Sequence, residues 1–291
     1  MEKFSVIEDK IYKYKRLDPV PTSDELNEFY GKEYYEIKKK NDIGSADRFI
    51  NDKKDKDEEL LWLQKTEYRD AYTIFHKYFT DGQILDIGCG SGEFLSYMGD
   101  NGFGIVGIEP SIIAYEKAKE RGLEVYNCDL FSFLEVDKKF DIINMTNVLE
   151  HIPEPVKVIA ECKKLLNKNG IIRIKVPNEF SQLQLEAIEK FNKEEYWVAI
   201  PDHVNYFNFE SLTNLLTNEG FEIINKTVDF PMELFMFMGE DYVKEKSLGK
   251  ICHEKRKKME MNLSEDMRRK LYDAFAQIGL GRNIYMYAIL K

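Results

Sequence analysis

Short apolar runs alternate with amphipathic stretches through the middle of the chain, and this pattern predicts the fold. Five runs are short and rich in β-branched or other apolar residues, as expected for buried strands. They span residues 84–87, 104–109, 123–127, 140–145 and 171–176. Stretches with one apolar helical face lie between several of these runs, at 93–101, 111–121 and 155–166. Strands and helices in turn predict an α/β fold, with a doubly wound, Rossmann-like and mostly parallel sheet.

The alternation resumes near the end of the chain. Two helices and two strands are predicted there, at 209–218 and 265–278 for the helices and at 221–228 and 283–290 for the strands. We expect these last two strands to pair as an antiparallel hairpin at the edge of the sheet. The complete sheet would then have seven strands.

The first 60 residues are polar and rich in tyrosine, and they predict a helical N-terminal segment that acts as a lid. Thr22 followed three residues later by Glu25 is typical of a capped helix start. Candidate lid residues are Tyr30, Tyr34 and Tyr35, and the alternative for them is packing alone.

A helix predicted over residues 58–78 leads into the first strand. We therefore divide the chain into the N-terminal segment, 1–60, and one domain, 61–291. Two stretches of this domain do not fit the alternation and are predicted to be insertions, at about 178–205 and 232–269. We expect the first insertion to lie over the carboxyl ends of the strands.

Composition excludes several classes of protein. The 291 residues include 42 Lys and Arg against 52 Asp and Glu, a net charge of −10, which disfavours nucleic acid or an anionic membrane as the partner. No apolar run reaches the roughly 18 residues of a membrane span, and the first residues lack the apolar core of a signal peptide. The four cysteines contain no C-x-x-C pair, so we expect reduced thiols, a cytoplasmic location and no structural zinc.

A glycine-rich corner follows the first predicted strand of the sheet. Asp86 lies near the end of that strand, and Gly88, Gly90 and Gly92 follow at every second position before a helix. Such a corner lets a nucleotide-like ligand approach the backbone closely. The dinucleotide fingerprint requires a glycine at position 93, which is Glu93, and no Lys-Ser/Thr follows as in a phosphate-binding loop.

Acidic residues follow the next two strands, at the edge of the sheet where ligands bind in such folds. Glu109, before Pro110, is placed to accept hydrogen bonds from a ribose diol. Asp129, before Leu130, is placed to accept from an adenine amino group while Leu130 covers the ring. The alternative for Asp129 is a turn or helix cap.

These motifs together resemble one enzyme family. The segments D-I-G-C-G-S-G at 86–92, Glu109, Cys128-Asp129, F-D-I-I-N at 140–144 and V-L-E-H-I-P-E-P at 148–155 have the order and spacing of the class I S-adenosylmethionine-dependent methyltransferases that act on small molecules. The resemblance covers about residues 81–177. The segments 17–35 and 201–207 are similar to methyltransferases of sugar, polysaccharide and other secondary biosynthesis.

The resemblance implies roles for individual residues. The corner, formed by Asp86, Gly88, Cys89, Gly90 and Gly92, would line the methionine part of the donor, S-adenosylmethionine. Glu109 and Pro110 would lie at the ribose, and Asp129 and Leu130 at the adenine. Asn144 and Thr146 would lie near the methionine end. Binding this donor requires neither a metal ion nor a covalent intermediate.

Two histidines are candidates for the base that removes a proton from the acceptor, His151 and His203. A structural role in a loop is the alternative for each. Some relatives that methylate catechol-like rings carry E-x-x-E-H here as a metal site. Asn147 stands in place of the first acid in this chain, so we predict no metal ion.

The sequence thus predicts methyl transfer from S-adenosylmethionine to a small-molecule acceptor, at a hydroxyl oxygen or, as alternatives, at carbon or nitrogen, with S-adenosylhomocysteine as product. The first alternative is a catalytically inactive donor-binding module that works as a partner subunit. The second is a nicotinamide-dependent oxidoreductase, which shares the fold type. The acceptor and the oligomeric state are not indicated by the sequence.

Overall fold

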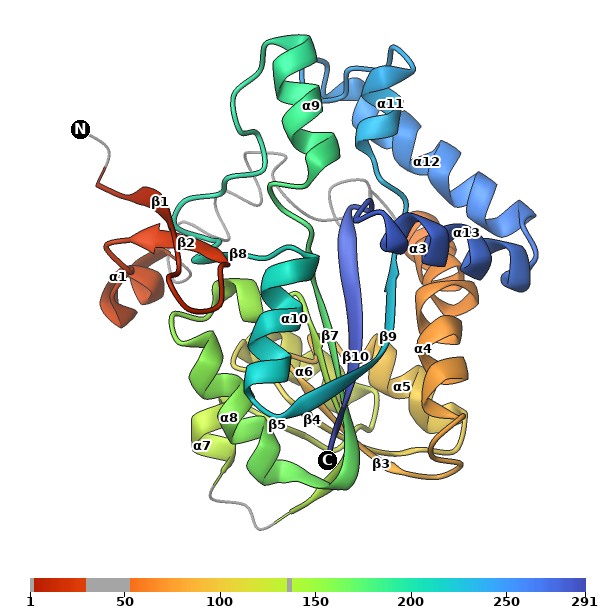
Figure 1. The fold of residues 1–291 in the computed structure, drawn as a ribbon. Helices are drawn as coiled ribbons and strands as arrows, with labels where there is room; N and C mark the ends of the chain where they lie inside the picture. Colours follow the sequence, from red (N-terminus) through yellow and green to blue (C-terminus); the bar gives the residue numbers. More distant parts are fainter. Residues whose placement is uncertain (1–2, 30–52, 135–137) are drawn as a thin grey trace.

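The computed structural model describes residues 3–29, 53–134 and 138–291, and its centre is a seven-stranded sheet with helices on both faces (Figure 1). The strand order is β5-β4-β3-β6-β7-β10-β9. The strands are β3 (Gln83–Ile87), β4 (Gly104–Ile108), β5 (Val125–Tyr126), β6 (Phe140–Thr146), β7 (Leu166–Pro177), β9 (Phe221–Val228) and β10 (Asn283–Leu290). Strand β10 is antiparallel to both β7 and β9, whereas β5, β4, β3, β6 and β7 are parallel. The predicted fold class is confirmed.

Side chains along each strand alternate between two packed layers, as the period of a strand requires. Ile84, Ile142 and Ile171 face one layer, which contains helices α4 (Glu67–Phe75) and α5 (Glu93–Asp100). Helix α6 (Ile112–Glu120) packs beside α5 through Ala118 and Leu95. The apolar residues between these positions face the opposite layer.

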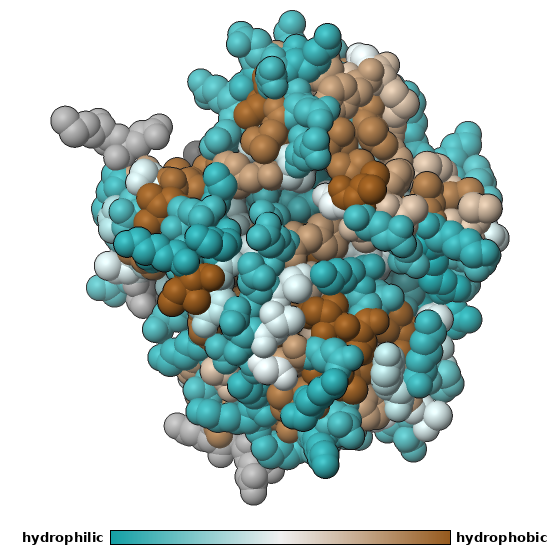
Figure 2. All heavy atoms as spheres, in the orientation of Figure 1, coloured by the Kyte–Doolittle hydropathy of each residue, from teal (hydrophilic) through white to brown (hydrophobic). Residues whose placement is uncertain are grey.

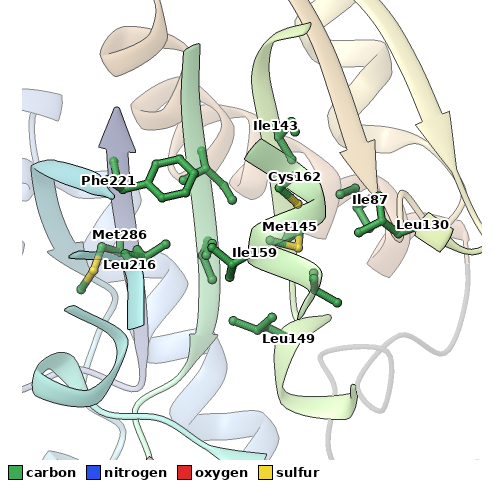
Figure 3. Close-up of a cluster of buried hydrophobic side chains, with 14 of the residues drawn as sticks. Ile87, Leu130, Ile143, Met145, Leu149, Ile159, Cys162, Leu216, Phe221 and Met286 are labelled. Atoms are coloured by element: carbon green, nitrogen blue, oxygen red, sulfur yellow. The ribbon is translucent and has the colours of Figure 1, made fainter. Parts of the chain in front are cut away.

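The opposite layer contains three helices, α7 (Leu130–Phe133), α8 (Pro155–Leu165) and α10 (Phe209–Asn218). Ile159 and Cys162 of α8 lie against Ile143 and Met145 of β6 (Figure 3). All four side chains are fully buried. Burial on both faces explains why these strands are nearly continuous apolar runs in the sequence.

We had expected a helical N-terminal segment, but this segment also contains strands. Strands β1 (Ser5–Glu8) and β2 (Lys15–Asp18) form a hairpin, and β2 also pairs with β8 (Asn205–Tyr206) in a second, three-stranded sheet. Helix α1 (Ser23–Glu28) follows, capped by Thr22 and Glu25 as predicted. Strand β2 pairs on its other edge with β8, which is distant in sequence, and no local pattern carries that information. The proposed lid residues Tyr30, Tyr34 and Tyr35 lie outside the described residues.

The helix predicted over 58–78 is divided in two. Helix α3 (Lys53–Lys65) ends before Thr66, whose backbone is not helical, and α4 begins at Glu67. The hydroxyl of Thr66 donates to the carbonyl of Trp62 at 2.7 Å, a local bond that competes with the regular helix. The break lets Glu67 stand at the start of a helix, with its side chain directed at the sheet.

The two predicted insertions lie on the side of the molecule where the parallel strands end (Figure 1). The first contains α9 (Gln182–Phe191), and the second contains α11 (Glu233–Phe237) and α12 (Ser247–Asn262). Helix α13 (Glu265–Gln277) packs on β9. Figure 2 shows apolar side chains gathered near α9 and α11 on an otherwise largely hydrophilic face. None of the helices formed by the described residues is long and apolar enough to cross a membrane.

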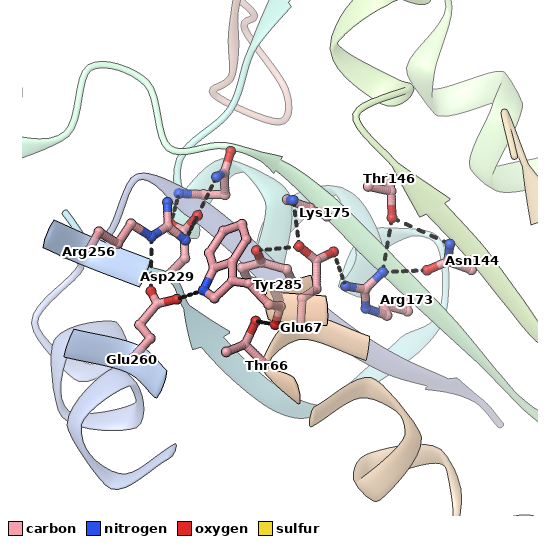
Figure 4. A network of polar contacts seen from close by, with 12 residues as sticks. Thr66, Glu67, Asn144, Thr146, Arg173, Lys175, Asp229, Arg256, Glu260 and Tyr285 are labelled. Carbon is pink, nitrogen blue, oxygen red and sulfur yellow. Dashed lines mark hydrogen bonds and ion pairs between the residues drawn. The ribbon is translucent and has the colours of Figure 1, made fainter. Parts of the chain in front are cut away.

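A buried network of charges fastens α12 to the body of the protein (Figure 4). The Arg256 guanidinium donates to Glu260 at 2.9 Å and to Asp229 at 3.1 Å. The indole of Trp62, on α3, donates to the second oxygen of Glu260 at 2.6 Å. Arg256 therefore links α12, α3 and the end of β9, and its charge is balanced inside the protein.

We expect Arg256→Met to destabilise the protein by about 3–5 kcal/mol, because it leaves two buried carboxylates without their cation. Urea unfolding of the purified variant measures this loss. The matched control is Lys255→Met on the same helix, because Lys255 is exposed and its ion pair with Glu240 contributes about 0–1 kcal/mol. Equal midpoints for the two variants would contradict a structural role for Arg256.

Candidate functional site

The glycine corner connects β3 to α5 through three residues with positive φ, Gly88 at 70°, Gly90 at 57° and Gly92 at 82°. A Cβ at Gly88 would lie 2.6 Å from Val148, and one at Gly92 would lie 2.3 Å from Leu123. A Cβ at Gly90 would meet no described atom within 4 Å. Gly88 and Gly92 are therefore required by the packing of the protein itself. Gly90 alone of the three faces open space, where a ligand can approach its backbone.

Cys89 lies between two of these glycines, with its side chain turned inward. It is buried in a cluster with Leu95 and Ala118. Burial, together with the nearby carboxylates of Asp86 and Glu109, raises the pKa of its thiol. Only the backbone of Cys89 is therefore available at the corner, and its N–H already donates to the carbonyl of Ile108 at 3.1 Å.

Glu109 is tied into the corner through both carboxylate oxygens. Oε2 accepts from the N–H of Gly90 at 2.9 Å, and Oε1 accepts from the N–H of Ser111 at 2.8 Å. The amide of Asn127 donates to the carbonyls of Glu109 and Pro110, at 2.8 Å and 3.0 Å. Each oxygen of Glu109 keeps a further lone pair, so the carboxylate can accept from a diol without releasing Gly90.

Asp129 and Leu130 follow β5. The Asp129 carboxylate caps α7 by accepting from the N–H of Ser132 at 2.8 Å, which is the helix-cap alternative, while the residue as a whole is exposed. Leu130 packs with Ile87 in the core (Figure 3). Contact of these two residues with an adenine stays a prediction.

A row of polar residues crosses the buried sheet beneath the corner. Asp86, Asn144, Arg173 and Tyr287 are register partners on the neighbouring strands β3, β6, β7 and β10, and all point to the same face. Asn144 donates to Asp86 at 2.6 Å and accepts from Arg173 at 2.6 Å. Arg173 also donates to the hydroxyl of Tyr287 at 3.1 Å. Through this row, hydrogen bonds link the charge of Arg173 in the middle of the sheet to Asp86 beneath the corner.

Arg173 is fully buried, and Glu67 at the start of α4 balances its charge at 2.9 Å (Figure 4). The second oxygen of Glu67 accepts from Lys175 at 2.8 Å. Burial alone would raise the pKa of Glu67, but Lys175 and Arg173 outweigh it and lower the pKa to about 2. Arg173 donates to Thr146 at 3.0 Å as well. The site residues Asn144 and Thr146 are thus held by one guanidinium.

Among the residues that the structure describes, no cationic side chain is in direct contact with Asp86. Burial raises its pKa to about 7, although the bond from Asn144 and the charge of Arg173 act in the opposite direction. A cation bound beside the corner would favour the ionised form of this carboxylate. The donor implied by the sequence carries such cations, an ammonium and a sulfonium.

The two candidate histidines lie together, with ring centroids 5.1 Å apart and rings nearly perpendicular. His151 belongs to a short 3-10 helix, η3 (Leu149–His151), after β6, and His203 belongs to the loop before β8. Nδ1 of His151 lies 2.7 Å from the backbone oxygen of Asp202 and 3.2 Å from its carboxylate. Nδ1 of His203 lies 2.9 Å from Glu179, which follows β7. The fold therefore brings together the two residues that sequence left as alternatives.

Burial alone would lower the pKa of both imidazoles, but acidic neighbours outweigh it. Asp202 and Glu150 raise the pKa of His151 to about 9. Glu179 raises the pKa of His203, while the charge of His151 opposes this. Both rings are thus placed to hold positive charge well.

This histidine pair also contains a set of ligands suited to a metal ion, although we predicted none. Glu150, His151 and His203 each offer one ligand atom, and these atoms lie within 4.8 Å of one another. Hydrogen bonds from the described residues do not occupy every oxygen of the carboxylates beside the rings. One oxygen each of Glu150 and Glu179 is buried without a hydrogen-bond partner among the described residues.

Three residues of the site, Glu67, Arg173 and Glu179, were not predicted from the sequence. Arg173 did carry a signal, because a charged residue inside the apolar run of β7 needs a buried partner. Glu67 and Glu179 carried none, since acids are common at helix starts and in loops. Their roles depend on contacts with residues 106 and 24 positions away in the chain.

Comparisons with known proteins identify the family. A family model described as a methyltransferase domain matches residues 62–226, more than half of the chain. The ubiquinone biosynthesis O-methyltransferase of Pasteurella multocida is 35% identical over 109 residues, which cover 32% of this chain and 45% of that protein. The chain thus spans about half the length of the curated relatives that it matches.

Solved structures of methyltransferases share the fold. A SAM-dependent methyltransferase from Archaeoglobus fulgidus matches with a TM-score of 0.51 and 17% identity, covering 88% of this chain and all of that chain. The 1,6-didemethyltoxoflavin-N1-methyltransferase of Burkholderia thailandensis, with bound S-adenosylhomocysteine, matches over the full length of both chains with a TM-score of 0.51 and 14% identity.

We expect Gly88→Ala to destabilise the protein more than Gly90→Ala. Both variants force alanine into a left-handed conformation, at about 1–2 kcal/mol. Only Gly88→Ala also drives a methyl group into Val148, which adds about 1–3 kcal/mol. Thermal unfolding of the two variants measures the difference. The double variant Gly88→Ala/Val148→Ala is the control, and failure to recover part of the loss would contradict the assigned clash.

Proposed function

The chain belongs to the methyltransferase-domain family, the class I S-adenosylmethionine-dependent methyltransferases that its sequence resembles, and we propose that it methylates a hydroxyl oxygen of a small molecule. S-adenosylmethionine is the donor and S-adenosylhomocysteine the product. One observation carries the proposal. The open corner at Gly90, with Glu109 beside it, lies at the same end of the sheet as the pair of His151 and His203.

The donor lies across the corner in this proposal. Its ribose hydroxyls donate to Glu109, which the free lone pairs of that carboxylate support. Asp86 faces the ammonium and sulfonium charges of the methionine part, and Thr146 lines the same end. Asp129, Leu130 and Pro110 border the adenine. The donor needs no metal ion for this binding.

The acceptor lies on the histidine side of the donor. Its hydroxyl oxygen attacks the methyl carbon from behind the sulfur, which requires alignment and exclusion of water. One histidine takes the proton that leaves the hydroxyl as the new bond forms. Residues 3–29 of the N-terminal segment and the insertions at about 178–205 and 232–269 form the walls of the acceptor pocket in this proposal. The name of the Pasteurella relative, an O-methyltransferase, supports oxygen as the methylated atom.

A donor-binding module without activity is the second candidate function. The raised pKa of His151 supports this candidate, because a histidine that is already protonated does not serve as a base. A nicotinamide-dependent oxidoreductase has less support, since Glu93 stands where its fingerprint needs glycine.

Calorimetric titration with S-adenosylmethionine and S-adenosylhomocysteine tests the donor, with NAD as the control ligand. We expect both sulfur nucleosides to bind and NAD not to bind. Glu109→Gln should weaken S-adenosylmethionine by about 1–3 kcal/mol, or about 5–150-fold, because a charged acceptor of two hydrogen bonds is lost. Binding of NAD alone would contradict the donor assignment, and an unchanged affinity in Glu109→Gln would remove Glu109 from the ribose site.

The affinity for S-adenosylmethionine should rise as the pH increases through about 7. Below that pH, Asp86 is protonated and gives no attraction to the cationic donor, whereas above it the ionised carboxylate does. Calorimetry between pH 6 and pH 8.5 measures the change, and proton release on binding near pH 7 gives a second readout. Asp86→Asn is the control, because it should remove the part of the pH dependence that comes from Asp86. A pH profile equal to that of the wild type in Asp86→Asn would exclude Asp86 as the responsible group.

A further inference from the structure

His203 is held by an acid that the proposed function has not used. Glu179 follows β7 directly and is 2% exposed, and its Oε1 lies 2.9 Å from Nδ1 of His203. The backbone N–H of Glu179 donates to the carbonyl of Phe207 at 2.9 Å, which fixes the residue in place. A carboxylate only accepts hydrogen bonds, so Nδ1 of His203 is the nitrogen that carries the hydrogen. Nε2 then keeps its lone pair.

The surroundings of His151 differ. Nδ1 of His151 lies against Asp202, whereas Nε2 lies 3.8 Å from Glu150, within ion-pair distance but beyond hydrogen-bond distance. Acidic oxygens near both nitrogens favour a ring that carries a hydrogen on each. For Nε2 of His203, in contrast, the part of the chain that the structure describes provides no hydrogen bond. Its ring is partly exposed, with 18% of the side chain accessible.

We propose that His203 is the catalytic base and that Glu179 is its positioning residue, while His151 is a hydrogen-bond donor to the reacting oxygen. This assignment rests on the proposed methyl transfer. It chooses between the two histidines that the sequence could not separate, and it gives a role to a buried acid outside the family motifs found in the sequence.

Bonds and charge are conserved in the methyl transfer. The acceptor O–H bond breaks and its proton goes to Nε2 of His203, while the oxygen forms a bond to the methyl carbon. The bond from carbon to sulfur breaks, and its electron pair stays on sulfur as the neutral thioether of S-adenosylhomocysteine. One positive charge is thereby moved from the sulfonium to the imidazole. Glu179 stabilises the charge where it arrives, because its carboxylate contacts the ring directly.

Nitrogen NMR of histidine-labelled protein tests the assignment, since the chain has only four histidines to assign. Spectra of the complex with S-adenosylhomocysteine, with EDTA present, are recorded between about pH 6 and pH 10 so that neutral rings are observed. We expect neutral His203 to carry its hydrogen on Nδ1. In Glu179→Met the hydrogen should move predominantly to Nε2. In Glu179→Gln, whose amide oxygen still accepts, it should stay on Nδ1.

A wild-type His203 protonated on Nε2, or an unchanged tautomer in Glu179→Met, would overturn the proposal. Reaction of the wild-type protein with diethyl pyrocarbonate, mapped by mass spectrometry, is independent of whether the variants fold. His203 should react at least about tenfold faster than His151, because only His203 presents a free lone pair, and equal or reversed rates would refute the choice of base.

Calorimetry with S-adenosylmethionine separates this inference from the proposed function. Glu179→Met should bind the donor within about twofold of the wild type, because Glu179 lies on the acceptor side. Failure of the wild type to bind the donor would contradict the proposed function, whereas the tautomer of His203 would still decide the inference.

Discussion

The structure depends on the neutralisation of one guanidinium, that of Arg173, in the centre of the sheet. A charge at this depth destabilises a fold unless every donor finds an acceptor. Glu67, Asn144, Thr146 and Tyr287 supply these acceptors from three different elements, α4, β6 and β10. The break between α3 and α4 puts Glu67 at a helix start, where its carboxylate reaches the guanidinium. The strand register from β3 to β10 places the other acceptors around Arg173. The floor of the donor corner is therefore rigid because a buried charge requires it to be.

Local patterns predicted most of the fold because the sheet is buried on both faces. Apolar runs such as Ile171–Ile172 and the strand-turn-helix corner at Gly88 carry their structure in their own residues. The three-stranded sheet is not local in this way, because Arg16 of β2 pairs with Asn205 of β8, far along the chain, as well as with Ile7 of β1. Thr66 shows a further limit. The helical pattern continues across it, and one hydroxyl bond together with the demand for Glu67 breaks the helix.

The candidate site divides in the same way. Glu109 and the glycines were predictable, because backbone conformation and strand ends are local features. The proximity of His151 and His203 was not, since they come from loops after β6 and before β8. The different roles proposed for the two histidines depend on Asp202, Glu150 and Glu179, which the fold brings close to them. A sequence can indicate which residues carry chemistry, but the partner at each ring nitrogen is decided by tertiary structure.

The place of β10 has a consequence for how the protein is made. Residues 283–290 insert between β7 and β9, and β9 pairs with no other strand in the described structure. During synthesis on the ribosome, the apolar edge of β7 therefore stays open until this last strand has been translated. Unpaired edges of this kind pair readily with other chains. Until β10 is present to cover it, that edge of β7 can pair with other chains.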